Sequence, residues 1–199
     1  MAEMTATTPD RHFSGVTGYA LGLGMIAGRG AVSRLMADLG GVVAGTRVVD
    51  LGCGAGVAVR EAARRGATAI GVEPSAEMRR LARLLTRRPA KRRITYLDGL
   101  AERIPLEEDS VDVVWALSSA HHWSDLAAAF AEIHRVLRPG GRALIGERLQ
   151  VPGRHSHYAL TEDHVEAMAA AASDGELDQV RIDRHQVGRT TEAVISASA

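Results

Sequence analysis

The chain has 199 residues, 46% of them hydrophobic, and its 24 Lys and Arg balance its 24 Asp and Glu. That length supports one domain with a hydrophobic core, and the balanced charge gives no overall field toward nucleic acid or anionic lipid. The single cysteine, Cys53, excludes an intramolecular disulfide, and the amino end lacks the basic and apolar pattern of a signal peptide, so we expect a cytoplasmic protein.

Residues 1–40 are predicted to form a flexible segment followed by a helix. Residues 13–28 carry no formal charge and contain five glycines, and they are too short and too rich in glycine to span a membrane. We expect this segment to pack on the main domain or to close over it as a lid; a role at a membrane surface is the alternative. Apolar side chains recur on one helical face at 31–39, where we expect the helix. Residues 41–199 are predicted to form the main domain.

From residue 47 onward, short apolar segments alternate with segments of helical spacing. Strands are predicted at 47–51, 69–72, 94–97, 111–117 and 142–146. Helices are predicted between them, the first ending at Arg65 and the later ones capped by Ser75, Ser124 and Thr161. We expect a turn at Pro139–Gly141. This alternation implies crossover connections and a mostly parallel sheet.

The carboxyl-terminal residues depart from that pattern. Residues 180–187 and 192–196 have the composition of two strands, joined by residues 188–190 as a hairpin. An antiparallel pair at the edge of a parallel sheet is common in large mixed sheets. The predicted fold is therefore an α/β three-layer sandwich with a mostly parallel, doubly wound sheet and a C-terminal antiparallel hairpin.

A glycine-rich turn follows the first predicted strand, with the residues Gly52, Cys53, Gly54, Ala55 and Gly56. Such a turn lets the backbone approach a ligand at a helix N-terminus. Glu73 ends the next strand, where an acid can accept hydrogen bonds from ribose hydroxyls. Val57 stands where a dinucleotide site needs a small residue, and the carboxylate of Asp50 would repel a pyrophosphate but could pair with an amino group. The pattern indicates a nucleoside that bears an amino acid.

With these features, the sequence resembles the class I S-adenosylmethionine-dependent methyltransferases, in particular the small methyltransferase domains that include the ubiquinone-biosynthesis type. The likeness covers residues 47–147. It rests on five segments in the family's order and spacing, VVDLGCGAGV, GVEPSAEM, LAERIPLEEDSVDVV, HHWSD and EIHRVLRPGGRALI. The resemblance implies a Rossmann-like fold with S-adenosyl-L-methionine as cofactor, and it makes residues 41–199 the domain that binds it.

The resemblance also implies roles for individual residues. Asp50 and the loop Gly52–Gly56 would hold the amino-acid part of the cofactor. Glu73 would bind the ribose hydroxyls. Ala116 and Leu117 would form the floor of the pocket under the methionine part.

On the adenine side, Pro74 and Met78 would pack on the ring, and Ala101 would lie near its edge. Family members often have an aspartate just before this alanine, where it accepts a hydrogen bond from the adenine amino group. Here that position is Leu100, and an acid lies two residues earlier at Asp98. A backbone group could replace the aspartate, Asp98 could reach the ring, or adenine could bind more weakly.

Two histidines, His121 and His122, follow the fourth predicted strand at the mouth of the expected pocket. One of them could act as a general base or shape the site around the sulfonium. The alternative is a hydrogen-bonded loop histidine that orients the backbone. Cys53 has no base that would activate it as a nucleophile, and we interpret it as structural.

A local basic cluster raises the alternative of a nucleic-acid substrate. Its members are Arg79, Arg80, Arg83, Arg87, Arg88, Lys91, Arg92 and Arg93. Solvated helix faces often carry such runs, and the neutral chain argues against strong polyanion binding. The segment after the fourth strand lacks the signature of enzymes that methylate base amino groups. No metal site is predicted, because His155 and His157 have no carboxylates around them.

We therefore predict S-adenosylmethionine-dependent methyl transfer to a small-molecule acceptor by in-line displacement. The protein would chiefly supply proximity and alignment, with a base needed only for an acceptor that is protonated at working pH. Alternatives are a non-catalytic module that binds S-adenosylmethionine, a nucleic-acid methyltransferase and a nicotinamide oxidoreductase. The sequence gives no strong signal for a nucleic-acid or membrane partner, and it leaves the oligomeric state open.

Overall fold

The centre of the structure, a computed structural model that describes residues 29–88, 90–151 and 159–199, is a seven-stranded sheet. The strands are β1 (Arg47–Leu51), β2 (Thr68–Val72), β3 (Ile94–Leu97), β4 (Val111–Leu117), β5 (Leu137–Arg148), β6 (Asp178–Val187) and β7 (Thr190–Ser198). The helices are α2 (Arg29–Leu39), α3 (Val57–Arg64), α4 (Ala76–Leu85), α5 (Leu126–Val136) and α6 (Glu162–Asp174), with short 3-10 turns η2 (Ala90–Arg92) and η3 (Ala120–His122). The predicted strands and helices are thus present.

The strand order is β3-β2-β1-β4-β5-β7-β6. All pairings among the first five strands are parallel, whereas β7 is antiparallel to both β5 and β6. The predicted doubly wound sheet with a C-terminal hairpin is confirmed. The order reverses between β1 and β4, and ligands of open α/β sheets bind at the carboxyl ends of the strands at such a point.

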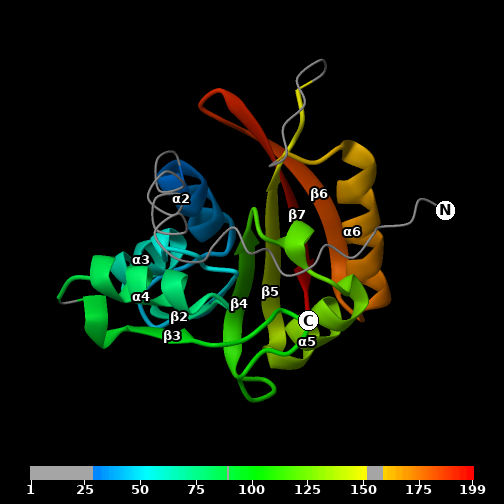
Figure 1. Ribbon diagram of the computed structural model, residues 1–199. Helices are drawn as coiled ribbons and strands as arrows, with labels where there is room; N and C mark the ends of the chain where they lie inside the picture. The colour runs from blue at the N-terminus through cyan, green and yellow to red at the C-terminus, as the bar shows by residue number, and fades with distance from the viewer. Residues whose placement is uncertain (1–28, 89, 152–158) are drawn as a thin grey trace.

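Figure 1 shows α2, α3 and α4 on one side of the sheet and α5 and α6 on the other. Each side has its own buried core. Met36 of α2 and Val59 of α3 pack with Trp115 of β4 on the first side. Phe130 of α5 and Met168 of α6 belong to the core on the second side. These apolar stripes fix the helices on the sheet and leave the strand ends to form a site.

Two local predictions were wrong. The cap of α5 is Asp125, whose side chain accepts a hydrogen bond from the Ala128 amide at 3.0 Å. Ser124, the predicted cap, instead donates its amide and hydroxyl to a carboxylate oxygen of Glu102, at 2.6 and 2.9 Å. Its hydroxyl is therefore engaged outside the helix.

The predicted turn at Pro139–Gly141 lies within β5 as a bulge. Val111 pairs with Leu137, but Val113 pairs with Arg142, so four residues loop out of the ladder between them. Gly140 adopts φ +77° there, and its amide donates to the Ala199 carbonyl at 2.7 Å. The last residue of the chain thus satisfies the backbone of the bulge.

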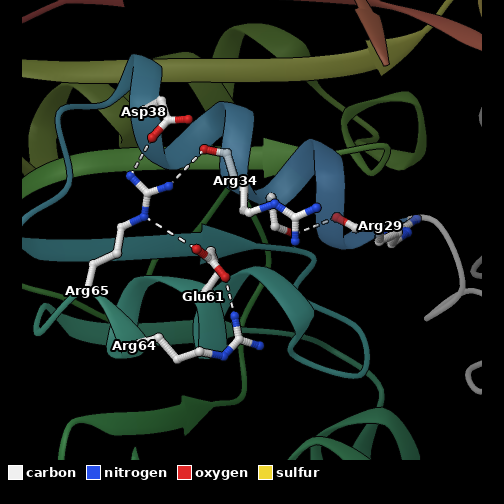
Figure 2. Close-up of polar contacts among 7 residues, drawn as sticks. Arg29, Arg34, Asp38, Glu61, Arg64 and Arg65 are labelled. Atoms are coloured by element: carbon white, nitrogen blue, oxygen red, sulfur yellow. Dashed lines mark hydrogen bonds and ion pairs between the residues drawn. The ribbon is translucent and has the colours of Figure 1, made fainter. Parts of the chain in front are cut away.

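A polar clamp fastens α2 to α3, as Figure 2 shows. The guanidinium of Arg65, at the end of α3, donates to the Asp38 carboxylate at 2.7 Å and to the Arg34 carbonyl at 3.2 Å. It also contacts Glu61, which forms an ion pair with Arg64. The clamp sets the position of α2, whose first residue reaches the carboxyl ends of the strands.

No helix in the described part of the chain is long and apolar enough to cross a membrane. The predicted lid at residues 13–28 lies outside the described residues, as do residues 152–158 of the insertion after β5.

Candidate functional site

The loops after β1 and β4 lie directly against each other at the switch point. Leu51 of β1 pairs with Ala116 of β4, and the hydroxyl of Ser119 donates to the Leu51 carbonyl at 2.7 Å. Ser118 adopts φ +48°, a left-handed conformation that non-glycine residues rarely take, and its amide donates to the Gly146 carbonyl at 2.7 Å. Such backbone strain often occurs at functional sites.

The glycine loop after β1 needs glycines because its backbone is left-handed and because, at Gly52 and Gly56, there is no room for a Cβ. Gly52, Gly54 and Gly56 have φ values of +66°, +50° and +73°. A Cβ on Gly52 would lie 2.6 Å from the Cβ of Ser119, and one on Gly56 would overlap the Tyr96 hydroxyl. A Cβ on Gly54 would meet nothing within 4 Å. The loop is therefore closed on the protein side and open at Gly54.

Glu73, at the end of β2, is buried against the glycine loop. One carboxylate oxygen accepts from the Gly54 amide and the other from the Ser75 amide, each at 2.9 Å. Burial raises the pKa of Glu73, although both amides favour the charged form. Each oxygen retains a further lone pair for a ligand hydroxyl.

Asp50 is a second buried acid at the same edge. Burial raises its pKa to about 8, and the positive charge of Arg29 opposes that rise. Trp115, its neighbour on β4, has an indole NH that favours the charged carboxylate. That NH is nevertheless buried without a hydrogen bond of ordinary geometry among the described residues.

Arg29 is the cation that faces Asp50. It begins α2, and its guanidinium donates to the Leu117 carbonyl at the end of β4, at 3.2 Å. Burial lowers the pKa of Arg29, and the carboxylates that oppose this are those of Asp50, Glu147 and Glu192. Burial also raises the pKa of Glu192, which lies 3.7 Å from Arg148. The edge thus concentrates buried acids, an environment that favours a cationic ligand.

A hollow of about 620 Å³ opens beside the glycine loop at the carboxyl ends of β2 and β3. Pro74, Leu100 and Asp98 are among the residues that line it. The side chain of Leu100 is 52% exposed, and Asp98 forms an ion pair with Arg79 at 2.9 Å. Of the residues expected on the adenine side, Pro74 and Leu100 line this hollow, whereas Met78 and Ala101 are not among its lining residues. A second hollow, of about 470 Å³, is lined by Arg47 at the start of β1 and shares Ile104 and Pro105 with the first.

Other predicted site residues are buried around this edge. Met78, Ala101, Ala116 and Leu117 are each at most 6% exposed. Cys53 is also buried, with a thiol whose pKa burial raises well above its usual value. Its packing and high pKa fit the structural interpretation.

The two histidines lie together in η3, with ring centroids 4.0 Å apart. Nδ1 of His121 lies 3.0 Å from a carboxylate oxygen of Glu147 at the end of β5. Nε2 of His121 is buried and has no hydrogen-bond partner in the described ranges.

Several members of the basic cluster make structural contacts. Arg79 pairs with Asp98, Arg83 donates to the Tyr96 carbonyl at 3.0 Å, and Arg93 donates to the Gly66 carbonyl at 3.1 Å. These contacts fasten α4 and the residues before β3 to the sheet. They give the cluster a structural explanation that needs no nucleic acid.

Sequence reasoning missed Arg29, Glu147 and Glu192. Glu147 had the same signal that identified Asp50 and Glu73, a single acid at the end of an apolar strand. Arg29 had no such signal, because it precedes the periodic part of its helix and reaches the site only through the packing of α2.

The site fits S-adenosylmethionine on three structural observations. The glycine loop is open at Gly54, where a ligand can approach the backbone. Buried Asp50 and Glu73 lie next to that loop, Asp50 two residues before it and Glu73 bonded to the Gly54 amide. The hollow at Pro74 and Leu100 provides space for a flat apolar ring.

Comparison with known proteins identifies the family. Residues 49–145 match the family model described as a methyltransferase domain. An uncharacterized methyltransferase of Mycobacterium tuberculosis is 43% identical over 99 residues, which are 50% of this chain and 38% of that protein. The 27-O-demethylrifamycin SV methyltransferase of Amycolatopsis mediterranei is 31% identical over 173 residues, which are 84% of this chain and 64% of that enzyme.

Solved structures agree on the fold. A SAM-dependent methyltransferase from Aquifex aeolicus superposes with a TM-score of 0.75 over 90% of this chain and 98% of that one, at 17% identity. The matched region thus spans 38% of the Mycobacterium relative's length and 64% of the Amycolatopsis relative's length. It spans nearly all of the Aquifex structure. By its motifs and these matches, the chain carries a methyltransferase domain over residues 49–145, and it has the fold of the S-adenosylmethionine-dependent methyltransferases.

Proposed function

We propose that the chain transfers the methyl group of S-adenosylmethionine to a small-molecule acceptor. The observation that carries this proposal is the pair of buried acids, Asp50 and Glu73, on either side of a glycine loop that is open at Gly54. The pairing suits a ligand with a cationic amino-acid part and a ribose. Family membership supports the same activity.

Each part of the site has a proposed task. Asp50 and the glycine loop hold the amino-acid part of the cofactor, and Glu73 accepts hydrogen bonds from the ribose hydroxyls. Pro74 and Leu100 line the adenine hollow, with Met78 and Ala101 buried beside it. Ala116 and Leu117 form the floor below the methionine part. When bound, S-adenosylmethionine supplies an electrophilic methyl group on a positively charged sulfur, which leaves as a neutral thioether.

The protein contributes binding, alignment and exclusion of water. The contact between Ser119 and the Leu51 carbonyl holds the loop after β4 against the loop after β1. An acceptor held by the loop after β4 would therefore face a cofactor held by the loop after β1. Proximity is the main source of rate for such a displacement. A small acceptor is supported by the Amycolatopsis relative, whose name gives 27-O-demethylrifamycin SV as its substrate.

Transfer of a labelled methyl group tests the proposal. The purified chain is incubated with methyl-labelled S-adenosylmethionine and a cell extract, and the labelled product is identified by mass spectrometry. We expect label in the small-molecule fraction, and we expect Glu73→Ala to abolish it while Glu77→Ala, on the same segment, retains it. Label confined to protein or nucleic acid contradicts the proposed acceptor class, and no transfer at all contradicts the activity.

A further inference from the structure

Glu147, which is buried, and His121, which is partly buried, form a pair between η3 and the end of β5. Glu147 lies near the end of β5 and is 1% exposed. One of its carboxylate oxygens accepts from the Ala120 amide at 2.9 Å and from the His121 amide at 3.4 Å. The other lies 3.0 Å from Nδ1 of the His121 ring. The carboxylate therefore fixes both the backbone and the ring of this histidine.

The partner of one ring nitrogen decides what the other can do. A carboxylate accepts but does not donate, so Glu147 holds the proton of the neutral ring on Nδ1. Nε2 then carries a free lone pair. Nε2 is buried and unpartnered among the residues that the structure describes, which is unusual for a buried polar atom. The ring thus presents an unused proton acceptor.

The backbone that carries the pair is joined to the strand ends around the glycine loop. His121 follows Ser119 by two residues, and Ser119 is hydrogen-bonded to the last residue of β1. Glu147 follows Gly146, whose carbonyl accepts from the Ser118 amide. The strand ends that place the pair are therefore the same ones that form the proposed cofactor site.

We infer that His121, positioned by Glu147, is the base that deprotonates the methyl acceptor, and that this acceptor is a neutral alcohol or phenol. The inference rests on the proposed function. In this step the acceptor O–H bond breaks, its proton forms a bond to Nε2 of His121, and the electron pair stays on the acceptor oxygen. The oxygen takes the methyl group as the electron pair of the carbon–sulfur bond returns to sulfur, and the proton stays on Nε2 of His121, beside the Glu147 carboxylate, until the product leaves.

A fixed base favours a hydroxyl over an amine or a carboxylate as the methyl acceptor. A phenol has a pKa of about 10 and an alcohol a higher one, so the proton must leave as the new bond forms. A neutral amine attacks through a lone pair before it loses a proton, so it gains less from a fixed base than a hydroxyl does. A carboxylate acceptor is already ionised at neutral pH and needs no base.

Nitrogen-15 NMR of the free protein tests the pair without any substrate. Two-bond correlations in the histidine rings show which nitrogen carries the proton, and the signals lost in His121→Asn assign that ring. At alkaline pH we expect the His121 proton on Nδ1 and the lone pair on Nε2. A proton on Nε2 overturns the inference whether or not the cofactor binds.

Kinetics separates a base from a histidine that only orders the loop. With the acceptor found by labelled transfer, we expect His121→Asn to lower kcat by about 10²- to 10⁴-fold, with an unchanged dissociation constant for S-adenosylhomocysteine. Glu147→Gln keeps an oxygen for the Ala120 amide but removes the charge, and we expect a smaller loss of kcat. His134→Asn, on α5, is the matched control and should retain full activity.

The product identifies the acceptor class. We expect NMR of the labelled product to show the methyl group on oxygen, and a methyl group on nitrogen or carbon overturns the inference. Absence of S-adenosylhomocysteine binding in the wild type contradicts the proposed function. Normal binding with full kcat in His121→Asn contradicts the role of the pair alone.

Discussion

Individual carboxylates give the carboxyl edge of the sheet its chemistry. Burial raises the pKa values of Asp50, Glu73 and Glu192, because a charged carboxylate is poorly solvated there. Arg29 is the main cation that opposes this at Asp50. A site with more buried acids than bases stabilises a bound cation at some expense of the stability of the free protein.

Asp50 should make the protein less stable as the pH rises. In the folded state it keeps its proton up to a pH of about 8, whereas its ordinary pKa is 3.8. The folded state binds more protons between these values, so the free energy of unfolding falls as the pH rises from 3.8 to 8. We expect Asp50→Asn to match the wild type near pH 4 and to melt roughly 5 °C or more above it at alkaline pH. Equal melting temperatures across the pH range would contradict the buried, protonated state of Asp50.

Substitutions at two loop glycines should separate folding from binding. Ala at Gly52 meets Ser119 and is strained at φ +66°, so we expect Gly52→Ala to lower the free energy of unfolding by about 2–4 kcal/mol in urea titrations. Gly188→Ala, with φ +61° and open space, is the control for strain alone, at about 1 kcal/mol. Gly54→Ala should resemble this control in stability but weaken cofactor binding. Equal losses at Gly52 and Gly188 would exclude a steric role for Ser119.

At the residue scale, an acid at the end of an apolar strand pointed to Asp50 and Glu73, and the structure buries both. The same pattern occurs at Glu147, which directly follows the strand predicted at 142–146, and it was overlooked. Arg29 could not be found this way, because its contact with the Leu117 carbonyl joins residues 88 positions apart. Contacts of this kind depend on how helices pack and leave no local signal.

Among the elements, α2 matters because it brings Arg29 to the strand ends. Its clamp to α3 depends on Arg65, whose side chain is 24% exposed. We expect Arg65→Ala to lower the free energy of unfolding by about 1–3 kcal/mol, since three acceptors lose a charged donor. Arg64 contacts the same Glu61 but does not reach α2, so Arg64→Ala should cost under about 0.5 kcal/mol. Chemical denaturation measures both, and equal effects would show that Glu61, and not the link to α2, is what matters.

The boundaries of the helices and strands followed from the sequence except where a contact distant in sequence decided the local structure. Both Ser124 and Asp125 can cap a helix, and the choice depends on Glu102, which occupies Ser124 from another loop. The glycines after Pro139 indicated a turn, yet the backbone of Ala199 pairs with them and the strand continues. Both differences arise from partners distant in sequence.

At the scale of the whole molecule, the fold was predictable because each strand and helix has a clear apolar period. Alternating strands and helices specify a parallel sheet, and the final two strands specify the hairpin beside β5. The switch between β1 and β4 then places Asp50, Glu73, Arg29 and the pair of His121 and Glu147 at one edge. The identity of the acceptor depends on side chains that meet only in the folded protein, which no sequence period encodes.

The most direct test of the account is the calorimetric titration of the purified chain with S-adenosylmethionine at several pH values. We expect one molecule to bind per chain, with an affinity that rises between pH 6 and pH 8 by up to about tenfold per unit, because a cationic ligand must displace the proton of Asp50. Asp50→Asn should bind more weakly and lose this pH dependence. The absence of binding heat, or an affinity indifferent to both pH and Asp50, would contradict the account.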